Sequence, residues 1–342
     1  MSEHVFHLGD AEPQVSNEHG ARTQASAQDF PILEGISLAR LSLKAGCFRE
    51  PHWHANANEL GYCIEGEALV TIFGDSNRHS VFTISPGQAF FVPSGAIHAI
   101  ENTGGTDAEL IIAFSDERPQ DFGFSGSIGM LTPNVMGNTW ELPAEALSAM
   151  PDVPDDLFAG KTDGAVEIPE SASYENDLKL DLEGLPPLLE NACGVLKVAR
   201  IDTWPALDEI ALYSLRIQGA GMREPHWHPV TAELGYVRTG RARMTVKSAD
   251  GSVDTYELAA GDVYFIPRGF PHHIENLEDE ETHFLVFFDQ AEVRDIGYTG
   301  SAGAFPRRIL APTLGMAAGD LPDLPPMPED LLLVEKRNPV DP

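Results

Sequence analysis

The sequence contains an internal repeat built around a histidine pair. The segment Arg49-Glu50-Pro51-His52-Trp53-His54 returns as Arg223-Glu224-Pro225-His226-Trp227-His228, and the two halves align from residue 30 onward at a constant offset of 174 residues without a gap. Self-similarity over this length indicates a duplicated domain. We therefore predict two domains in the 342-residue chain: residues 1–165, which begin with a polar N-terminal arm, and residues 166–342, which end in a C-terminal tail.

The spacing of the repeated histidines favours a metal site on a strand. Side chains alternate between the two faces of a strand, so His52 and His54 point the same way and can bind one ion. Glu59 lies an odd number of positions after His54, and one unbroken strand would direct it to the opposite face. A turn at residues 55–58 and a returning antiparallel strand would bring Glu59 back, so the spacing predicts a β-hairpin.

A second repeated segment offers a fourth ligand in each half. Residues 87–102 carry a glycine, a Pro-Ser-Gly turn and His98, and residues 261–276 repeat this spacing around His272. Three imidazoles and one carboxylate leave two neighbouring positions of an octahedral shell open, which favours Mn(II) or Fe(II) over a closed structural zinc. The predicted ligands are His52, His54, Glu59 and His98 in the first half, and His226, His228, Glu233 and His272 in the second.

The remaining pattern indicates an all-β fold. Short apolar runs alternate with Gly, Pro, Asn and Asp in each half, as they do in β-barrels. After the last run, residues 139–150 have helical propensity, and a proline-rich acidic stretch over residues 151–186 connects the halves. The strands predicted in the first half are Ile36–Leu43, Tyr62–Ile64, Ala68–Phe73, Ser80–Ile84, Ala89–Val92 and Glu109–Phe114.

The repeated segments resemble the two motifs of the cupin family. The first half matches both motifs, from Gly46 to Gly66 and from Gly87 to Asn102, and the second departs only at Ala220, where the motif has a glycine. The resemblance implies an all-β protein of two tandem cupin (jelly-roll) β-barrels, each with a short helical cap.

Among two-barrel cupins, the chain resembles the oxalate decarboxylases and oxalate oxidases, including the germin-like type. The resemblance implies Mn(II) at both sites, dioxygen as co-substrate or cofactor, and oxalate or a similar small carboxylate as substrate, converted by a decarboxylase into formate and carbon dioxide. It also implies that Arg49 and Arg223 bind a substrate carboxylate near the metal. The residues alone fit an ion pair with Glu50 or Glu224 equally well, because the odd offset from the histidine directs each arginine outward unless the strand bends.

The general acid of these decarboxylases has no matched counterpart in the sequence. Their Ser-Glu-Asn-Ser lid corresponds to residues 115–121, where Glu117 is the predicted substitute and Asp116 and Asp121 are alternatives. Asp121 aligns with Asp295 of the second half, which indicates a structural role for both. Without a placed acid, an oxalate oxidase that yields peroxide is one alternative, and a non-catalytic metal-binding or storage bicupin is another.

The charge balance argues against two classes of partner. The sequence has 22 Lys and Arg against 53 Asp and Glu, a formal net charge of −31, which repels nucleic acid and anionic membranes. The spacing of the three cysteines, Cys47, Cys63 and Cys193, fits neither a disulfide framework nor a metal site. No apolar run reaches the ~18 residues of a membrane helix, and no signal peptide pattern opens the sequence. We therefore expect a cytoplasmic protein whose partner is a small carboxylate, and a homo-oligomer is compatible with the sequence.

Overall fold

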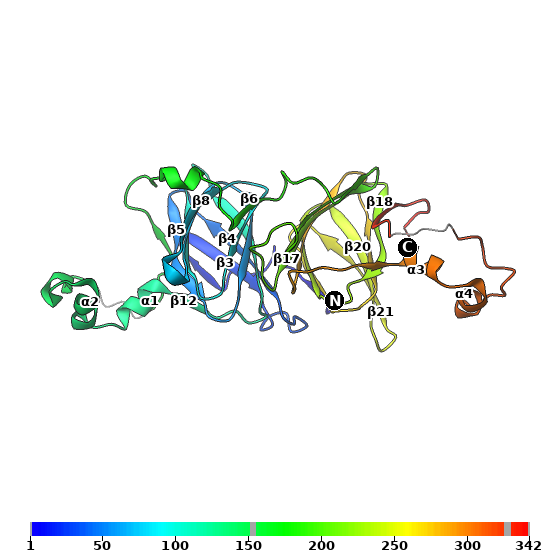
Figure 1. Ribbon diagram of the computed structural model, residues 1–342, viewed down its shortest axis with the longest axis horizontal. Coiled ribbons are helices and arrows are strands. Elements are labelled where there is room, and N and C mark those ends of the chain that lie inside the picture. Colours follow the sequence, from blue (N-terminus) through cyan, green and yellow to red (C-terminus); the bar gives the residue numbers. More distant parts are fainter. Residues whose placement is uncertain (1, 151–154, 325–329, 341–342) are drawn as a thin grey trace. The chain divides into compact units, whose positions relative to one another are not determined.

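The protein consists of antiparallel sheets arranged as two barrels (Figure 1). The computed structural model describes residues 2–150, 155–324 and 330–340, and in them the chain forms four sheets, two for each repeat. The predicted all-β fold of two tandem jelly-roll barrels is confirmed.

The first barrel encloses an apolar core between two facing sheets. One sheet has the order β14-β9-β6-β11-β4-β3-β2 and contributes Leu41 and Phe90 to the core, and the other has the order β12-β5-β10-β7-β8 and contributes Val70 and Phe82. Every strand predicted in this half overlaps an observed one. Its strands are β2 Val15–Asn17, β3 Gly20–Ala25, β4 Ser37–Leu43, β5 Cys47–His54, β6 Glu59–Glu65, β7 Ala68–Phe73, β8 His79–Ile84, β9 Gln88–Val92, β10 Ile97–Asn102, β11 Ala108–Phe114, β12 Asp121–Gly123, β13 Ala159–Lys161, which pairs with β5, and β14 Lys179–Asp181.

The second barrel repeats this arrangement. Its sheets have the orders β1-β22-β19-β24-β17-β16-β15 and β21-β20-β23-β18-β25, and β26 pairs with β18. Its strands are β1 Val5–Phe6, β15 Leu189–Asn191, β16 Gly194–Ala199, β17 Ala211–Ile217, β18 Gly221–Trp227, β19 Glu233–Thr239, β20 Arg241–Lys247, β21 Val253–Ala259, β22 Val263–Ile266, β23 His272–Asn276, β24 Thr282–Phe288, β25 Ile296–Gly297 and β26 Leu333–Glu335.

The hairpin predicted between His54 and Glu59 is wrong. Strands β5 and β6 are consecutive, but β5 pairs with β10, whereas β6 pairs with β9 and β11 in the facing sheet. Residues 55–58 therefore carry the chain from one sheet to the other. Because the inner faces of two packed sheets point toward each other, Glu59 meets the histidines from across the barrel and needs no strand reversal within one sheet.

Two short helices follow the last long strand of each barrel. They are α1 Phe124–Gly129 and α2 Pro133–Trp140 in the first half, with a 3₁₀ turn at Ala144–Leu147, and α3 Tyr298–Ala304 and α4 Arg307–Thr313 in the second. None of the helices in the described part of the chain has the length and apolarity needed to span a membrane.

The helix predicted over residues 139–150 was placed too late in the sequence. Helix α2 begins at a cap that the prediction overlooked, because the Thr132 hydroxyl accepts a hydrogen bond from the Val135 N–H at 3.2 Å. Pro133 occupies the first helical position, where its missing N–H costs nothing. Only the end of α2 and the 3₁₀ turn fall within the predicted range.

The predicted N-terminal arm is structured. It contains β2 and β3, which pair with each other in the first barrel. It also contains β1, which pairs with β22 of the second barrel. Strand β14 lies 174 residues after β1 and pairs with β9 of the first barrel. The compact units are residues 11–184 with 204–208, and residues up to Asp10 with 185–203 and 209–342. The division falls after Gly184 rather than at residue 165, because β14 still belongs to a sheet of the first barrel.

Candidate metal centres and their arginines

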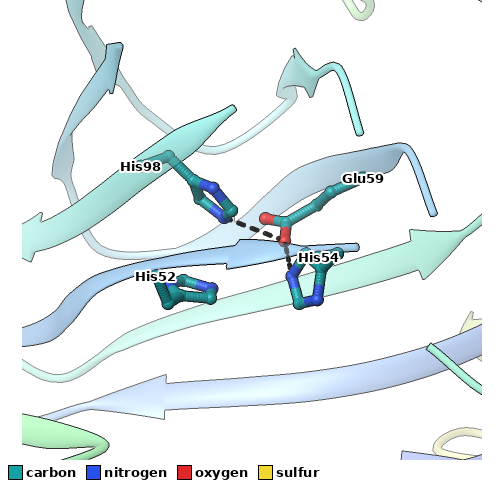
Figure 2. A group of neighbouring side chains, drawn as sticks. All are labelled: His52, His54, Glu59 and His98. Atoms are coloured by element: carbon teal, nitrogen blue, oxygen red, sulfur yellow. Dashed lines mark hydrogen bonds and ion pairs between the residues drawn. The ribbon is translucent and has the colours of Figure 1, made fainter. Parts of the chain in front are cut away.

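The four ligands predicted in the first half lie together inside the first barrel (Figure 2). Strand β5 carries His52 and His54, the neighbouring β10 places His98 directly opposite His52, and β6 of the facing sheet carries Glu59. One donor atom from each residue lies within 4.8 Å of the other three, and all four side chains are buried. The Glu59 Oε2 atom is 3.0 Å from His54 Nε2 and 3.1 Å from His98 Nε2.

The second barrel brings its four predicted ligands together in the same way. His226 and His228 come from the β18 segment, His272 from β23 and Glu233 from β19 of the facing sheet. Glu233 Oε2 lies 2.7 Å from His228 Nε2 and 3.2 Å from His272 Nε2.

The donor set of the first site fits a divalent cation. Nδ1 of His52 is 2.8 Å from the Glu50 carbonyl oxygen and Nδ1 of His98 is 3.1 Å from that of Ala96. A carbonyl oxygen only accepts, so each Nδ1 donates, and the Nε2 of the neutral ring keeps a lone pair that a metal can accept. Oε1 of Glu59 is buried without a hydrogen-bond partner among the described residues. A cation between these atoms would satisfy the lone pairs and the carboxylate together.

Burial and the neighbouring charges favour the ligating forms of these side chains. Burial holds the pKa of His52 well below its ordinary value, which keeps this imidazole neutral. Burial opposes ionisation of Glu59, but His98 and His54 outweigh it and hold the pKa of Glu59 below its ordinary value. A metal binds neutral imidazole and ionised carboxylate, so both protonation states suit a metal centre.

A β-bulge turns Arg49 into the same cavity. On β5, Arg49 and His52 are three residues apart, whereas their partners on β10, Ile100 and His98, are two apart. The extra residue on β5 reverses the alternation, so Arg49 and His52 share the inner face despite their odd spacing. The second barrel has the same bulge between Arg223 and His226. This is the local bend that a substrate-binding role for these arginines requires.

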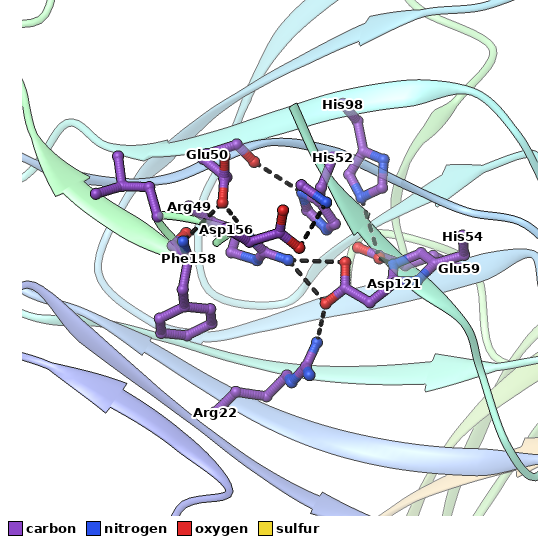
Figure 3. Close-up of polar contacts among 12 residues, drawn as sticks. Arg22, Arg49, Glu50, His52, His54, Glu59, His98, Asp121, Asp156 and Phe158 are labelled. Carbon is purple, nitrogen blue, oxygen red and sulfur yellow. Dashed lines mark hydrogen bonds and ion pairs between the residues drawn. The ribbon is translucent and has the colours of Figure 1, made fainter. Parts of the chain in front are cut away.

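The principal ionic partner of Arg49 is Asp121 (Figure 3). Nη2 of Arg49 lies 2.9 and 2.8 Å from the two carboxylate oxygens of Asp121, and Nη1 donates to the Phe158 carbonyl at 3.0 Å. Glu50 is a more distant partner at 3.7 Å, because its own oxygens accept hydrogen bonds from the Ser125 and Phe158 N–H groups. The predicted alternative of an Arg49–Glu50 pair is therefore secondary to a contact with Asp121.

A second arginine, Arg22 on β3, pairs with the same carboxylate. Burial opposes ionisation of Asp121, but the charges of Arg49 and Arg22 outweigh it and hold its pKa below the ordinary value. The sequence prediction did not include Arg22. The repeat gave little signal for it, because residues 17–25 and 191–199 share only three identical residues at matched positions and Leu196 stands in the place of Arg22.

In the second barrel, Arg223 pairs with Asp295 at 2.7 Å. Asp295 also lies 3.2 Å from Nδ1 of His228, so it contacts a predicted metal ligand. The alignment of Asp121 with Asp295 therefore reflects a shared role as partner of the buried arginine.

The predicted proton donor, Glu117, does not line the first cavity. Its carboxylate accepts a hydrogen bond from the Gly35 N–H at 2.9 Å, and its backbone carbonyl accepts one from Ala27. The cavity has a volume of about 20 Å³, and Glu59 is the only carboxylate among its lining residues in the described part of the chain. The lining consists of Arg22, Ala39, Leu41, Arg49, His52, His54, Glu59, Ile100, Ile112 and Phe114.

The sequence matches the cupin family over residues 6–147 and 182–319. It is 28% identical to an oxalate decarboxylase of Bacillus subtilis over 309 residues, which cover 86% of this chain and 78% of that protein. A probable oxalate decarboxylase of Arthroderma benhamiae is 26% identical over 84% of this chain and 73% of its own length. A germin-like protein of Arabidopsis thaliana, subfamily 2 member 2, is 33% identical over 33% of this chain and 54% of its own length.

Solved structures of oxalate decarboxylases have the same two-barrel fold. A structure of oxalate decarboxylase superposes with a TM-score of 0.88 at 25% identity, covering 98% of this chain and 90% of that one. The Bacillus subtilis oxalate decarboxylase at pH 4.6 gives a TM-score of 0.87 at 24% identity over 98% of this chain and 88% of that one. With both barrels matched by the family, the chain belongs to the cupins.

Proposed function

We propose that the protein is a manganese-dependent enzyme that decarboxylates oxalate, or a similar small carboxylate, to formate and carbon dioxide. The observation that carries this proposal is the joint lining of one buried cavity by three of the candidate ligands, His52, His54 and Glu59, and by the Arg49 guanidinium, with His98 completing the ligand group. A cation beside a guanidinium suits a substrate with two adjacent carboxylates, one for each positive group. The likeness to oxalate decarboxylases over most of the chain supports the same substrate class.

The residues of the first site have distinct roles in this proposal. The three Nε2 atoms and Glu59 would hold Mn(II), which supplies Lewis-acid binding of a carboxylate and, with dioxygen, one-electron chemistry. Arg49 orients the second carboxylate through its planar fork. The apolar side chains of Leu41, Ile100 and Phe114 line the cavity and exclude water, which strengthens these electrostatic contacts.

Decarboxylation of hydrogen oxalate also requires a group that carries a proton. The carboxyl proton must leave before the C–C bond breaks and must reach the formyl carbon afterwards. Asp121 is the carboxylate in contact with Arg49, and its lowered pKa keeps it ionised and able to accept that proton. We assign this role to Asp121 in place of Glu117, whose carboxylate is bound to the Gly35 N–H.

One observation favours a second function, an oxalate oxidase that yields peroxide. The same two arginines that lower the pKa of Asp121 make its protonated form a minor species, which weakens it as a donor to the formyl carbon. Without that donation, the fragment is oxidised to a second carbon dioxide and dioxygen is reduced to hydrogen peroxide.

The products of oxalate turnover test the proposal. Protein expressed with manganese is analysed for metal, for which two ions per chain are expected, and then supplied with oxalate under air. Formate and carbon dioxide in equal amounts support the decarboxylase, and peroxide with two carbon dioxides per oxalate supports the oxidase. A protein that holds metal at both sites but consumes no oxalate would be a non-catalytic bicupin, and the enzymatic proposal would be rejected.

A further inference from the structure

The two cavities differ at three matched positions, one of which exchanges Ile112 for Val286 and keeps an apolar side chain. In the first, Arg22 and Ala39 line the cavity, whereas the residues 174 positions later in the second are Leu196 and Tyr213. The metal ligands and the bulged arginine are common to both barrels. Arg22 is therefore the charged residue by which the first cavity departs from the second.

This difference gives the first cavity one additional positive charge. Arg22 and Arg49 share a single carboxylate, that of Asp121, whereas Asp295 pairs with one arginine, Arg223, and also lies 3.2 Å from Nδ1 of His228. The neighbouring glutamates do not change the comparison. Glu50 accepts from two backbone N–H groups, and its counterpart Glu224 accepts from the N–H groups of Thr299 and Leu332 in the same manner.

The hydrogen bonds of Arg22 are incomplete. Its Nη1 donates to Asp121, but its Nε is buried and has no hydrogen-bond partner in the described part of the chain. Leaving a buried donor of a charged group unpaired is costly, so this atom indicates that a further acceptor belongs in the cavity. An incoming carboxylate offers that acceptor.

Asp121 lies where such a carboxylate would bind. Its oxygens accept hydrogen bonds from both guanidinium groups, two from Nη2 of Arg49 and one from Nη1 of Arg22 (Figure 3). The cavity of about 20 Å³ holds roughly one water, so a dicarboxylate enters only if a group moves. The Asp121 side chain is 20% exposed and lies on the short strand β12, whereas that of Arg49 is 4% exposed.

We propose that Arg22 is a specificity-determining residue of the first site. Together with Arg49 it selects a dicarboxylate, which displaces the Asp121 carboxylate from both guanidinium groups, and the second site lacks this selection because Leu196 replaces the arginine. One substrate carboxylate binds at the metal and the other between the two arginines, so a monocarboxylate forgoes the arginine contacts. The inference rests on the proposed function and assigns substrate binding to the first barrel.

Binding measured without turnover tests the inference. Manganese-loaded wild-type protein and the variants Arg22→Leu, Arg22→Lys and Asp121→Asn are titrated with oxalate, and separately with acetate, by calorimetry under anaerobic conditions. Leucine is the residue that the second barrel carries at this position, so the fold has a precedent for it. Arg216→Gln is the matched control, since Arg216 forms a half-buried ion pair with Glu281 and lines neither cavity.

Arg22→Leu should weaken oxalate binding by roughly ten- to hundredfold, the range for losing a charged hydrogen bond, and Arg22→Lys by less. Acetate binding, the metal content and the control should be unchanged. Asp121→Asn should bind oxalate more tightly than the wild type, because the arginines lose their internal carboxylate, and a merely structural role for Asp121 predicts the opposite.

Two results separate the inference from the function on which it rests. Wild-type affinity for oxalate in Arg22→Leu, or weaker oxalate binding in Asp121→Asn, would overturn the inference and leave the proposed function standing. A metal-loaded wild-type protein that binds no oxalate would overturn both.

Discussion

Removal of the metal should lower the melting temperature of each barrel. An ion in the first barrel would join His52, His54 and His98 of one sheet to Glu59 of the facing sheet, contacts that the unfolded chain cannot make together. Free metal at a hundredfold excess over its Kd stabilises the folded state by about 2.7 kcal/mol per site. In a domain of roughly 170 residues, each kcal/mol shifts the melting temperature by about 2–4 °C, so each site should contribute about 5–11 °C.

Differential scanning calorimetry with added manganese, and then with a chelator, measures this shift. His54→Ala should abolish the manganese-dependent increment of the first barrel and His228→Ala that of the second, with one ion lost in each variant. The melting temperatures with and without manganese are compared within the same variant, so the packing defect left by the substitution affects both values and cancels in their difference. Equal melting temperatures with and without metal in the wild type, or loss of both ions from either single variant, would refute two independent sites that join facing sheets.

Further predictions concern the charged residues around the first cavity. Arg49→Lys should raise KM for oxalate by roughly ten- to hundredfold, since a lysine cannot reproduce the planar fork, whereas Arg223→Lys should leave the kinetics of turnover unchanged. Glu117→Gln should keep kcat within about twofold of wild type, as expected for a carboxylate bound to the Gly35 N–H, and a large loss would restore it as proton donor. Asp121→Asn should destabilise the protein by about 3 kcal/mol at neutral pH by leaving two arginines without their carboxylate. Because folding lowers the pKa of Asp121, this loss of stability should be complete above the unfolded-state pKa of about 3.9. The loss should shrink as the pH falls through the folded-state pKa. Urea titrations at several pH values measure the free energy of unfolding of both proteins and check this dependence.

The grouping of the candidate ligands was predictable because their positions follow from strand alternation and from the internal repeat. His52 and His54 share a face whatever the topology, and the recurrence of the pattern excluded coincidence. The position of Glu59 was predicted correctly for the wrong reason. Its odd spacing from His54 reflects a crossing from one sheet to the other rather than a hairpin. Alternation along one strand does not indicate which sheet the next strand joins.

The inward arginines and the carboxylate proposed as proton carrier were less accessible to sequence reasoning. The inward position of Arg49 depends on a bulge, which alters the alternation without changing the residues that take part. Arg22 precedes Asp121 by 99 residues, and the two meet because their strands lie in the two facing sheets of the barrel. No local sequence pattern joins them. Glu117 was chosen for its place in the lid segment, but the backbone turns its carboxylate toward Gly35.

The products formed from oxalate by the manganese-loaded protein test the central proposal most directly. Isotopically labelled oxalate is followed by NMR and gas analysis in the wild type and in Arg49→Lys, with peroxide measured in parallel. The proposed decarboxylation predicts one formate and one carbon dioxide per oxalate in the wild type, and a strongly reduced kcat/KM in the variant. Oxalate that remains intact in the presence of fully metal-loaded wild-type protein and air would contradict it.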